Sequence, residues 1–497
     1  MKRIVSALLL LAMTVSFAAC AEAPSSSPSD TTVSDSQKTP DTTISEIVYE
    51  EDSLPSTLDF GKDNVNILSP FINASADILQ MPEITVEELT SEVINDSIYN
   101  RERFVEERLN VEINNVQAKN TNDEIEKQLN SGDDNYHIYA VNLLTTSALC
   151  LYDYFVDLKQ VEYLDLEKPW WSQPFNDEAE LLGELYFTSG SLALSMLRNM
   201  NVVYYNKALA EDFTKNTPEL SDLYAVVEDG KWTFDKWVEL SEGIYQDLNG
   251  NSERDGEDLY GIGYVRTTII EAFFSSFDID VLSRTSDGWF ELNVNTDKLY
   301  TSLDKMYNLF FNTPECYAPE VGECDVDDME FLFAGGSVLF MVNEMRSVET
   351  NALRNMQDEY GILPFPKYDE KQAEYYTLSN EHMTFAIPST ISDTTVAGAV
   401  LEAMASYSYR DTVPAYLNIA IKGKYMNDPG SRRMIDTIVN GYKPDASKIY
   451  FKSLANEYTA HYRYMLINQE NSFAANHATQ SKVVERLLKY SRIDLEK

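Results

Sequence analysis

Segments with the pattern of β-strands alternate with helical segments along most of this chain, from Asp63 onward. In the first part of that stretch, strands are predicted at 64–68, 111–116 and 136–141, and helices at 90–109 and 123–129. The helix at 90–109 has Ile98, Val105 and Leu109 on one side, which predicts its buried face. Strands that alternate with helices favour a mostly parallel sheet covered by helices on both faces. The sequence therefore predicts an α/β fold.

A second set of alternating segments begins near Gly183. Its predicted strands are 201–206, 259–265, 337–342 and 382–388, and its predicted helices are 231–246, 301–311, 394–409 and much of 413–495. The helices at 301–311 and 394–409 carry apolar residues at helical spacing, which predicts one buried face for each. The helix at 231–246 has a start signal, because Thr233 is a suitable N-cap and Trp232 and Trp237 flank it as an apolar pair. Two such sets in about 430 residues predict two to three lobes.

Polar residues follow two strands of the first set. Ser69 and Asn73 come after the strand at 64–68, and Asn142 follows the strand at 136–141. In open α/β sheets, ligands bind beyond the carboxyl ends of the strands. We therefore expect these three side chains at a ligand cleft, and the alternative is that each has an ordinary role in a turn.

The N-terminal residues predict export from the cell. Residues 1–19 have a basic start and a short apolar run, which is the pattern of a secretory signal peptide. Ala18 and Ala19 directly precede Cys20, as in a bacterial lipobox, so Cys20 is predicted to become a lipidated N-terminus. Ordinary cleavage and free secretion is the alternative.

The segment 20–58 is rich in Ser, Thr and Pro and poor in large apolar residues. Such a segment buries too little surface to offset the entropy lost on ordering, so it is predicted to be a flexible tether. No later stretch reaches about 18 uninterrupted apolar residues. We therefore expect the folded part to lie at the extracellular face of the cytoplasmic membrane, held to the membrane by its lipid alone.

The charge of the chain excludes one class of partner. With 39 basic and 81 acidic residues, the net charge is −42, which would repel nucleic acid. Carboxylates are so frequent that two of them close together give no catalytic signal. The four histidines show no metal-binding spacing, and no CxxC motif is present, so zinc chemistry is not expected. Besides Cys20 there are three cysteines, of which Cys316 and Cys324 could bridge a short loop.

The stretch DLNGNSERDGED, residues 247–258, carries oxygen donors at the spacing of a calcium loop. The predicted ligands are Asp247, Asn249, Asn251, the Glu253 carbonyl, Asp255 and Asp258. Position 6 of the loop is Ser252 where Gly is usual, and a strand rather than a helix is predicted to follow. The sequence thus predicts a structural Ca²⁺ site, and the alternative is a polar turn that needs no ion.

Several stretches together resemble one family. They are the lipobox and tether, DLEKPWW (165–171), ELYFTSGSLALSMLRNMNVVYYNKALAEDF (184–213), DGKWTFDKWVELSE (229–242), the loop just described, FAGGSVLFMVNEMRS (333–347), YGILPFPKYDEKQAEYY (360–376) and IPSTISDTTVAGAVLEAM (387–404). Their order resembles that of the extracellular solute-binding proteins of ABC importers, in the family 1 group that includes sugar and oligosaccharide binders.

The resemblance implies a two-lobed fold of the type II periplasmic-binding-protein kind, with the ligand in a cleft between the lobes. By this analogy lobe 1 comprises 60–180 with 378–412, and lobe 2 comprises 181–377 with 413–497. It also implies a carbohydrate as the solute, an ABC permease as the membrane partner, a monomeric state and no catalytic residues.

Sugar binding requires flat aromatic faces and fixed polar groups for the hydroxyls. Trp170 and Trp171 are the best candidates for a platform, and packing between the lobes is the alternative. Arg198, Asn343 and Arg346 occupy stretches where relatives often contact ligand, and surface ion pairs are their alternative role. Trp289 lies in a predicted hairpin, either exposed or in its core.

Two other functions remain open at this point. One is a secreted glycoside hydrolase, which would need a pair of carboxylates. The other is a cell-surface protein that adheres to glycans without a transporter. The sequence shows no GxSxG, HExxH or triad-like motif to support an enzyme.

Overall fold

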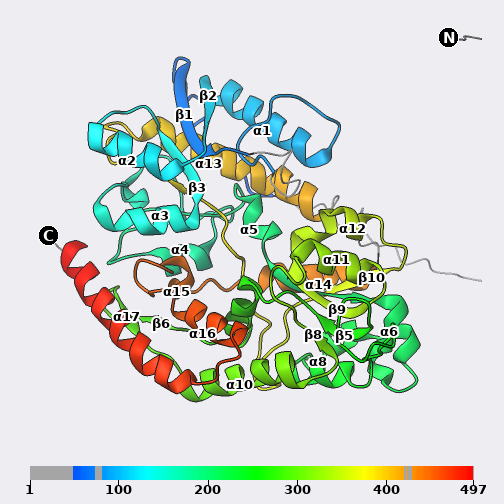
Figure 1. Cartoon of the computed structure of the whole chain (residues 1–497). Coiled ribbons are helices and arrows are strands. Elements are labelled where there is room, and N and C mark those ends of the chain that lie inside the picture. Colours follow the sequence, from blue (N-terminus) through cyan, green and yellow to red (C-terminus); the bar gives the residue numbers. More distant parts are fainter. Residues whose placement is uncertain (1–48, 73–80, 419–420, 422–427, 496–497) are drawn as a thin grey trace, which may run out of the picture. The chain divides into compact units, whose positions relative to one another are not determined.

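The structure of this protein is a computed structural model that describes residues 49–72, 81–418, 421 and 428–495 (Figure 1). The predicted signal peptide, Cys20 and the tether up to residue 48 lie outside the described residues, and so does Asn73. Two larger β-sheets and one two-stranded sheet are present in the part that is described.

The first sheet has the strand order β11-β3-β1-β2. Its strands are β1 (Asp63–Pro70), β2 (Val111–Ala118), β3 (Ile138–Asn142) and β11 (Met383–Ala386). β1 pairs in parallel with β2 and β3, whereas β11 runs antiparallel to β3, with Met383 opposite Asn142. The four strands lie where the sequence predicts them, and the carboxyl ends of β1 and β3 lie at the same edge.

Helices pack around the first sheet (Figure 1). They are α1 (Val93–Leu109), α2 (Thr121–Ser131), α3 (Leu143–Leu149), α4 (Gln173–Ala179), α5 (Leu194–Arg198) and α13 (Thr395–Tyr407), with short 3-10 turns at Cys150–Tyr152 and Leu158–Gln160 and a π-turn at Ser408–Thr412. α13 packs against α1, and the apolar face of α1 that the sequence predicts, including Ile98, Val105 and Leu109, is buried. The spacing of apolar residues therefore identified the buried face correctly.

The second sheet has the order β10-β4-β9-β5-β8. Its strands are β4 (Asn201–Asn206), β5 (Tyr260–Gly263), β8 (Cys316–Tyr317), β9 (Val338–Glu344) and β10 (Tyr360–Leu363). β5 is parallel to β8 and β9, but β4 is antiparallel to both β9 and β10. This sheet is therefore mixed rather than mostly parallel, because the strand through which the chain enters it, β4, runs against the neighbours on both of its sides.

The helices that pack with the second sheet are mostly short. They are α6 (Lys207–Phe213), α7 (Leu223–Glu228), α8 (Phe234–Ser241), α9 (Ala272–Ser276), α10 (Thr296–Asn312), α11 (Val326–Ala334), α12 (Asn351–Arg354) and α14 (Pro429–Asn440), with 3-10 turns at Pro218–Ser221, Thr268–Glu271 and Met345–Glu349. Thr233 caps α8 as predicted, its hydroxyl accepting from the Lys236 amide at 3.2 Å, and Trp232 and Trp237 are buried beside it. α8 ends earlier than predicted, because Gly243 has a φ of +75° that a helix does not allow.

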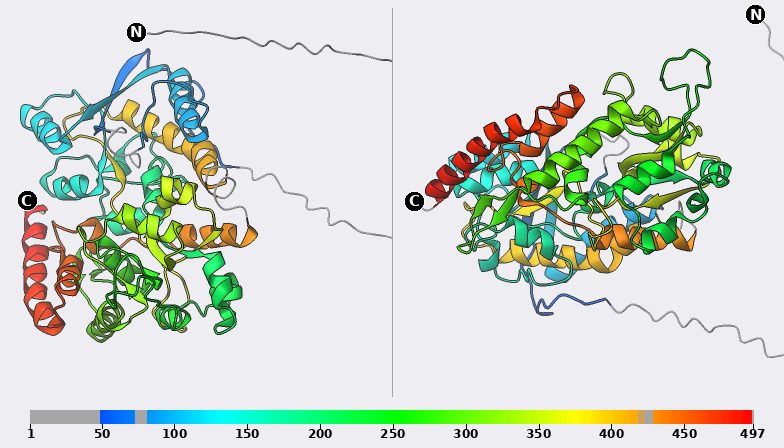
Figure 2. Two further views of the ribbon diagram at one scale, coloured as in Figure 1. Left: turned by 45° about the vertical axis from the view of Figure 1, so that its right-hand side comes forward. Right: turned by 90° about the horizontal axis from the view of Figure 1, so that it is seen from below.

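The C-terminal part is helical, as predicted, with α15 (Ala446–Ile449), α16 (Tyr458–Ile467) and α17 (Phe473–Leu495). α17 packs against α16 and against the hairpin of β6 (Leu282–Arg284) and β7 (Phe290–Leu292), as the views in Figure 2 show. Trp289 belongs to the core of this hairpin, because it is buried and its indole donates to the Leu488 carbonyl at 3.1 Å.

Two segments that connect the sheets run side by side. Met200, just before β4, pairs with Ser379 in an antiparallel bridge. The Asn201 amide donates to the Leu378 carbonyl at 2.9 Å, and the Asn380 amide donates to the Asn199 carbonyl at 2.9 Å. We call residues 199–201 and 378–381 the hinge, because these two chain crossings are hydrogen-bonded to each other.

Cys316 and Cys324 are both buried and remain free thiols, so the bridge that their spacing allowed is not formed. Cys316 belongs to β8, whereas the Cys324 thiol donates to the Asp325 carbonyl at the start of α11. Within the described ranges, no helix combines the length and the apolar character that crossing a membrane requires.

Candidate functional site

Two cavities adjoin at the hinge and share the residues Asn199, Arg346 and Glu381. The large cavity has a volume of about 460 Å³ and the small cavity about 280 Å³. Because they share part of their walls, we treat them as one cleft. Its size is within the range of small-molecule binding sites in proteins.

The small cavity lies at the carboxyl edge of the first sheet. Its wall includes Ser69 and Pro70 at the end of β1, and Asn142 at the end of β3. α5 contributes Ser195 and Arg198 to the same wall. Ser69 and Asn142, which the sequence predicts to follow two strand ends at a cleft, thus both line a cavity.

The large cavity is lined by the hinge, by the end of β9 and by the C-terminal helices. Glu344 and Arg346 come from the end of β9 and the turn after it. Lys448 and Tyr464, on α15 and α16, line another part of the wall. Residues more than 300 positions apart in the sequence, such as Leu143 and Tyr464, therefore meet in one cavity.

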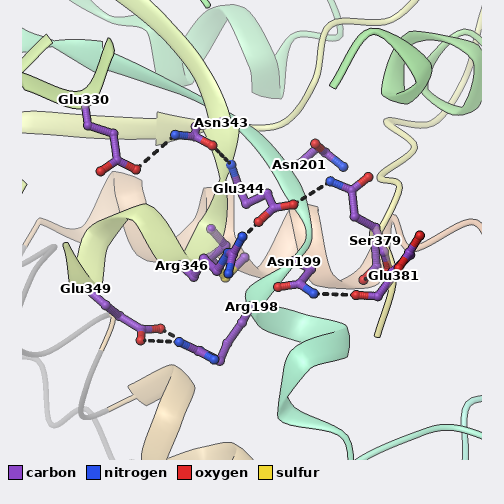
Figure 3. Close-up of polar contacts among 12 residues, drawn as sticks. Arg198, Asn199, Asn201, Glu330, Asn343, Glu344, Arg346, Glu349, Ser379 and Glu381 are labelled. Atoms are coloured by element: carbon purple, nitrogen blue, oxygen red, sulfur yellow. Dashed lines mark hydrogen bonds and ion pairs between the residues drawn. The ribbon is translucent and has the colours of Figure 1, made fainter. Parts of the chain in front are cut away.

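Figure 3 shows the hydrogen bonds that fix the polar groups at the hinge. Glu344 accepts from the Asn380 side-chain amide at 2.5 Å and from Arg346 Nε at 2.5 Å. The Asn199 side-chain amide donates to the Glu381 carbonyl at 2.6 Å. The Arg346 side chain is 31% exposed, so its guanidinium lies at the surface of the cleft and is oriented by Glu344.

Asn142 connects the first sheet to the hinge. Its side-chain oxygen caps α3 by accepting from the Leu144 amide at 2.8 Å, and its amide donates to Glu381 Oε2 at 3.1 Å. Ser69 is buried and donates to Asn115 Oδ1 at 2.7 Å. Both side chains are thus held by protein groups beside the small cavity, which combines the turn role and the cleft position considered from the sequence.

Arg198 lines the small cavity but is engaged by protein. It makes a two-pronged ion pair with Glu349, at 3.1 Å from Nε and 2.8 Å from Nη2, and the Tyr416 hydroxyl also donates to Glu349 at 3.0 Å. Although burial alone would lower it, Glu349 raises the pKa of Arg198 above its ordinary value. With only 4% of its side chain exposed, Arg198 acts as a structural clamp in this structure.

Trp170 and Trp171 do not form a platform in this structure, which corrects the prediction from the sequence. Their exposed fractions are 0% and 2%, and neither lines the cleft. The Trp171 indole donates to Glu402 on α13 at 3.0 Å. Gly190 packs against this corner so closely that a Cβ there would lie 2.2 Å from the Trp170 carbonyl oxygen. Both tryptophans instead pack beside the first sheet, Trp171 against α13 and Trp170 against Tyr409, so the packing between the lobes given as the alternative is not what these contacts show.

Asn343 also lies away from the cleft. It is 5% exposed, and its amide donates to Glu330 on α11 at 3.0 Å (Figure 3). The alternation of side chains along β9 turns Asn343 toward α11, whereas Glu344 and the following Arg346 line the cavity. One position along a strand therefore decides which of two neighbouring polar residues can meet a ligand.

The pattern of the sequence does not predict three aromatic residues that line the cleft. Phe71 lines the small cavity and is 48% exposed, and Phe451 and Tyr464 line the large one, with Tyr464 also 48% exposed. On α16, Tyr458 and Tyr462 are buried, so Tyr464 is off the buried face. That position is the only signal in the sequence that could have distinguished it among the tyrosines.

The loop 247–258 lies outside the cleft and is closed by its own hydrogen bonds. Asp247 accepts from the amides of Gly250 at 2.6 Å and Ser252 at 3.0 Å. Asn249 accepts from the Asn251 amide at 2.9 Å. Asn251 in turn accepts from the amide of Glu253 at 2.7 Å.

The acidic residues at the end of the loop differ in burial. Asp255 is half-buried, and it accepts a hydrogen bond from the Asn251 side-chain amide at 2.7 Å. Asp258 is fully buried, and accepts from the Leu248 amide at 3.1 Å and the Tyr245 hydroxyl at 3.3 Å. Across the described residues, no group of three or more His, Cys, Asp or Glu side chains is arranged to hold a metal ion. The Ca²⁺ site stays a prediction, which a measurement of Ca²⁺ binding would test.

Solved structures share this fold. The galacto-N-biose/lacto-N-biose I-binding protein of an ABC transporter from Bifidobacterium longum, in complex with lacto-N-biose, has a TM-score of 0.57 at 11% identity, covering 87% of this chain and 98% of that one. The apo form of RafE from Streptococcus pneumoniae has a TM-score of 0.53 at 13% identity, with coverage of 86% and 98%.

An ABC substrate-binding protein from Listeria monocytogenes, in complex with cycloalternan, has a TM-score of 0.51 at 11% identity, with coverage of 87% and 98%. No family model matches this chain, and no curated protein matches its sequence. At these identities the likeness establishes a two-lobed fold of the periplasmic-binding-protein kind, which confirms the fold class predicted from the sequence.

Proposed function

We propose that this protein is the substrate-binding component of an ABC importer and that it captures a carbohydrate in the cleft at the hinge. The observation that carries the proposal is a cleft walled by two sheet-containing parts, with oriented polar groups at the hinge and exposed aromatic rings beside it. Two of the structural neighbours described above support the same reading, since one is a galacto-N-biose/lacto-N-biose I-binding protein of an ABC transporter and the other is an ABC substrate-binding protein in complex with cycloalternan.

The chemistry of the cleft fits a polyhydroxylated ligand. Arg346 and Asn142 offer donors whose positions are fixed by Glu344 and Glu381. Phe71 and Tyr464 present ring faces on which the apolar side of a sugar ring can stack. Fixed donors lose little entropy when they meet a hydroxyl, so selectivity for the pattern of hydroxyls follows from the rigidity of the hinge.

Capture would involve closure about the hinge. Because the two crossings are bonded to each other at Met200 and Ser379, they can bend together while the sheets on either side stay intact. A sugar that touches Asn142 from one side and Tyr464 from the other would favour the closed form over the open one, and the closed form would be what a permease recognises.

The anchor and location form part of the proposal. A lipid on Cys20 would hold the protein at the extracellular face of the cytoplasmic membrane through the tether, as the small residues before Cys20 support. The folded part, as a tethered monomer, would stay within reach of the membrane and could deliver a solute to a permease there.

Binding without turnover tests the proposal. Purified protein is screened against neutral and acidic oligosaccharides by thermal shift and tryptophan fluorescence, and each sugar is then recovered and checked for cleavage. We expect at least one sugar to raise the melting temperature and to be recovered unchanged. In Arg346→Gln, its affinity should fall about tenfold or more, since a hydrogen bond from a charged group is lost.

Arg486→Gln is the matched control, because Arg486 is an exposed arginine on α17 outside the cleft. Cleavage of a bound glycan would instead support a glycoside hydrolase. Adhesion would be supported by two results together. The protein would bind glycans at the cell surface, and cells that lack the protein would still take up every sugar normally. Cleavage or adhesion would overturn the proposal.

A further inference from the structure

The charges around the large cavity differ from those of the chain as a whole. The chain has 39 basic and 81 acidic residues, about two acids for each base. The cavity is lined by equal numbers of each, namely Arg346, Lys448, Lys452 and Arg463 against Glu271, Glu344, Glu381 and Glu457. Basic side chains are therefore concentrated where a ligand would bind.

Three of these basic residues share one wall, which we call the basic wall: Lys448, Lys452 and Arg463, on or beside α15 and α16. Two of them share a single carboxylate. Glu271 contacts Lys448 Nζ through Oε2, and its Oε1 lies 3.2 Å from Arg463 Nη1. The three side chains are 14%, 12% and 4% exposed for Lys448, Arg463 and Glu271, so water screens this group poorly.

The group is held in place by hydrogen bonds. Thr459 donates to Glu271 Oε2 at 2.8 Å and accepts from Lys448 Nζ at 2.8 Å. Arg463 Nε is buried and has no hydrogen-bond partner within the described residues. Buried charge without full compensation is costly, so this arrangement is expected only where something else balances it.

The third cation, Lys452, is exposed and makes no ion pair with any residue that the structure describes. Glu457 is the other carboxylate on this side of the cavity. The three cations of the basic wall therefore have two carboxylates beside them, Glu271 and Glu457. The simpler reading, that these cations only fasten the C-terminal helices, accounts for Lys448 and Arg463 but gives Lys452 no role.

Aromatic rings lie next to the cations. Lys448 Nζ is 5.3 Å from the ring centroid of Phe451, and the Arg463 guanidinium carbon is 4.8 Å from that of Tyr464. A ring face and a cation side by side match a sugar ring that carries an acidic substituent, because one side chain covers the ring while its neighbour meets the charge.

We propose that the basic wall binds the carboxylate or sulfate group of an acidic saccharide, so that the ligand class of this protein is acidic rather than neutral sugars. The inference rests on the proposed function and narrows its ligand. The acidic group would supply the missing negative charge between Lys452 and the pair of Lys448 and Arg463.

The environment of Lys448 disfavours the charged form of its side chain. Burial and the charge of Arg463 lower the pKa of Lys448 well below its ordinary value, even though Lys448 contacts Glu271. An anion at the wall would act against both effects.

Paired ligands test the inference. Binding to the purified full chain is measured by calorimetry for trigalacturonate and its methyl ester, and for neocarrabiose sulfate and its desulfated form. Within each pair the sugar skeleton is shared and the acidic group is either esterified or removed, and the two pairs separate carboxylate from sulfate. We expect one acidic member to bind at least tenfold more tightly than its neutral partner, and added salt to reduce that difference.

Variants locate the effect. Lys452→Ala should weaken the acidic member about two- to fivefold, as is typical for one exposed ion pair, and Lys452→Glu should weaken it further. Neither should alter the melting temperature of the free protein by much, because Lys452 is exposed. Lys489→Ala, an exposed lysine of α17 outside both cavities, is the control and should leave binding unchanged.

The outcomes separate this inference from the proposed function. A neutral sugar bound as tightly as its acidic partner, or acidic binding that is the same in Lys452→Glu, overturns the acidic ligand class and leaves carbohydrate capture standing. If no acidic or neutral saccharide binds, in these pairs or in the wider screen, both proposals fail.

Discussion

Replacing Asp445 by Asn should remove a large pH dependence from the stability of this protein. Asp445 is 7% exposed and caps α15, where its carboxylate accepts from the Ser447 amide and hydroxyl, each at 2.8 Å. Burial, more than the neighbouring Asp280 and Glu178, raises the pKa of Asp445 from 3.8 to about 7, against the lowering effect of the bonds from Ser447.

The sign follows from linkage. Between the unfolded pKa near 3.8 and the folded pKa near 7, the folded protein binds a proton that the unfolded chain does not. This contribution to stability is therefore fully present below about pH 4 and is lost as the pH rises through 7. A shift of about three units corresponds to about 4 kcal/mol of unfolding free energy between those limits.

Asp445→Asn keeps the geometry and removes the titration. The amide oxygen can accept from the Ser447 amide, and the amide nitrogen can donate to the Ser447 hydroxyl, which is both donor and acceptor. Relative to the native protein, the variant should become more stable by about 3 to 4 kcal/mol on going from pH 4.5 to pH 8. Denaturant unfolding of both proteins at several pH values measures this difference, from which all other titrating groups cancel.

Ser447→Ala provides a directional check. The hydroxyl lowers the pKa of Asp445, so its removal should move the pH midpoint of the stability loss upward. Parallel pH profiles for native protein and Asp445→Asn would refute the reasoning, because they would mean that Asp445 has the same pKa folded and unfolded.

Three further predictions concern the loop, the clamp and the cleft. Calcium should raise the melting temperature of the purified protein, with chelation reversing the effect and Asp247→Ala abolishing it, and an equal rise in the variant would contradict the calcium prediction. Arg198→Ala should cost about 3 to 5 kcal/mol of unfolding free energy, because it leaves the Glu349 carboxylate without its cationic partner, and a loss below about 1 kcal/mol would show that the buried pair is not a clamp. Tyr464→Ala should weaken sugar binding about two- to tenfold through the lost ring contact, with an unchanged melting temperature, and unaltered affinity would remove Tyr464 from the site.

The periodicity of apolar residues was sufficient for most of the fold. It located β1, β2, β3, β4 and β9, and the apolar faces of α1, α10 and α13, because strands and helices repeat on different periods and bury one face each. The strand β10 was not predicted, since YGIL reads as a strand only once it pairs with β4. The antiparallel pairing of β4 likewise depends on contacts far apart in sequence.

The candidate site was predicted in part. The rule that ligands lie beyond strand ends predicts Ser69 and Asn142 as cleft residues, and the resemblance to binding proteins implies Arg198 and Arg346. All four line the small cavity. It failed for Trp170 and Trp171, because an aromatic pair before a chain crossing has the same sequence whether it faces a cleft or a helix such as α13.

What the chain alone determines is local: an acidic α/β protein with a predicted export signal, a polar loop at 247–258 and polar residues at the ends of β1 and β3. Only the tertiary structure decides that α15 and α16 return to the hinge and place Lys448, Arg463 and Tyr464 opposite the first sheet. The physical reason is that a cleft is formed by the surfaces of elements that meet after folding. The residues on such surfaces carry no periodicity of their own.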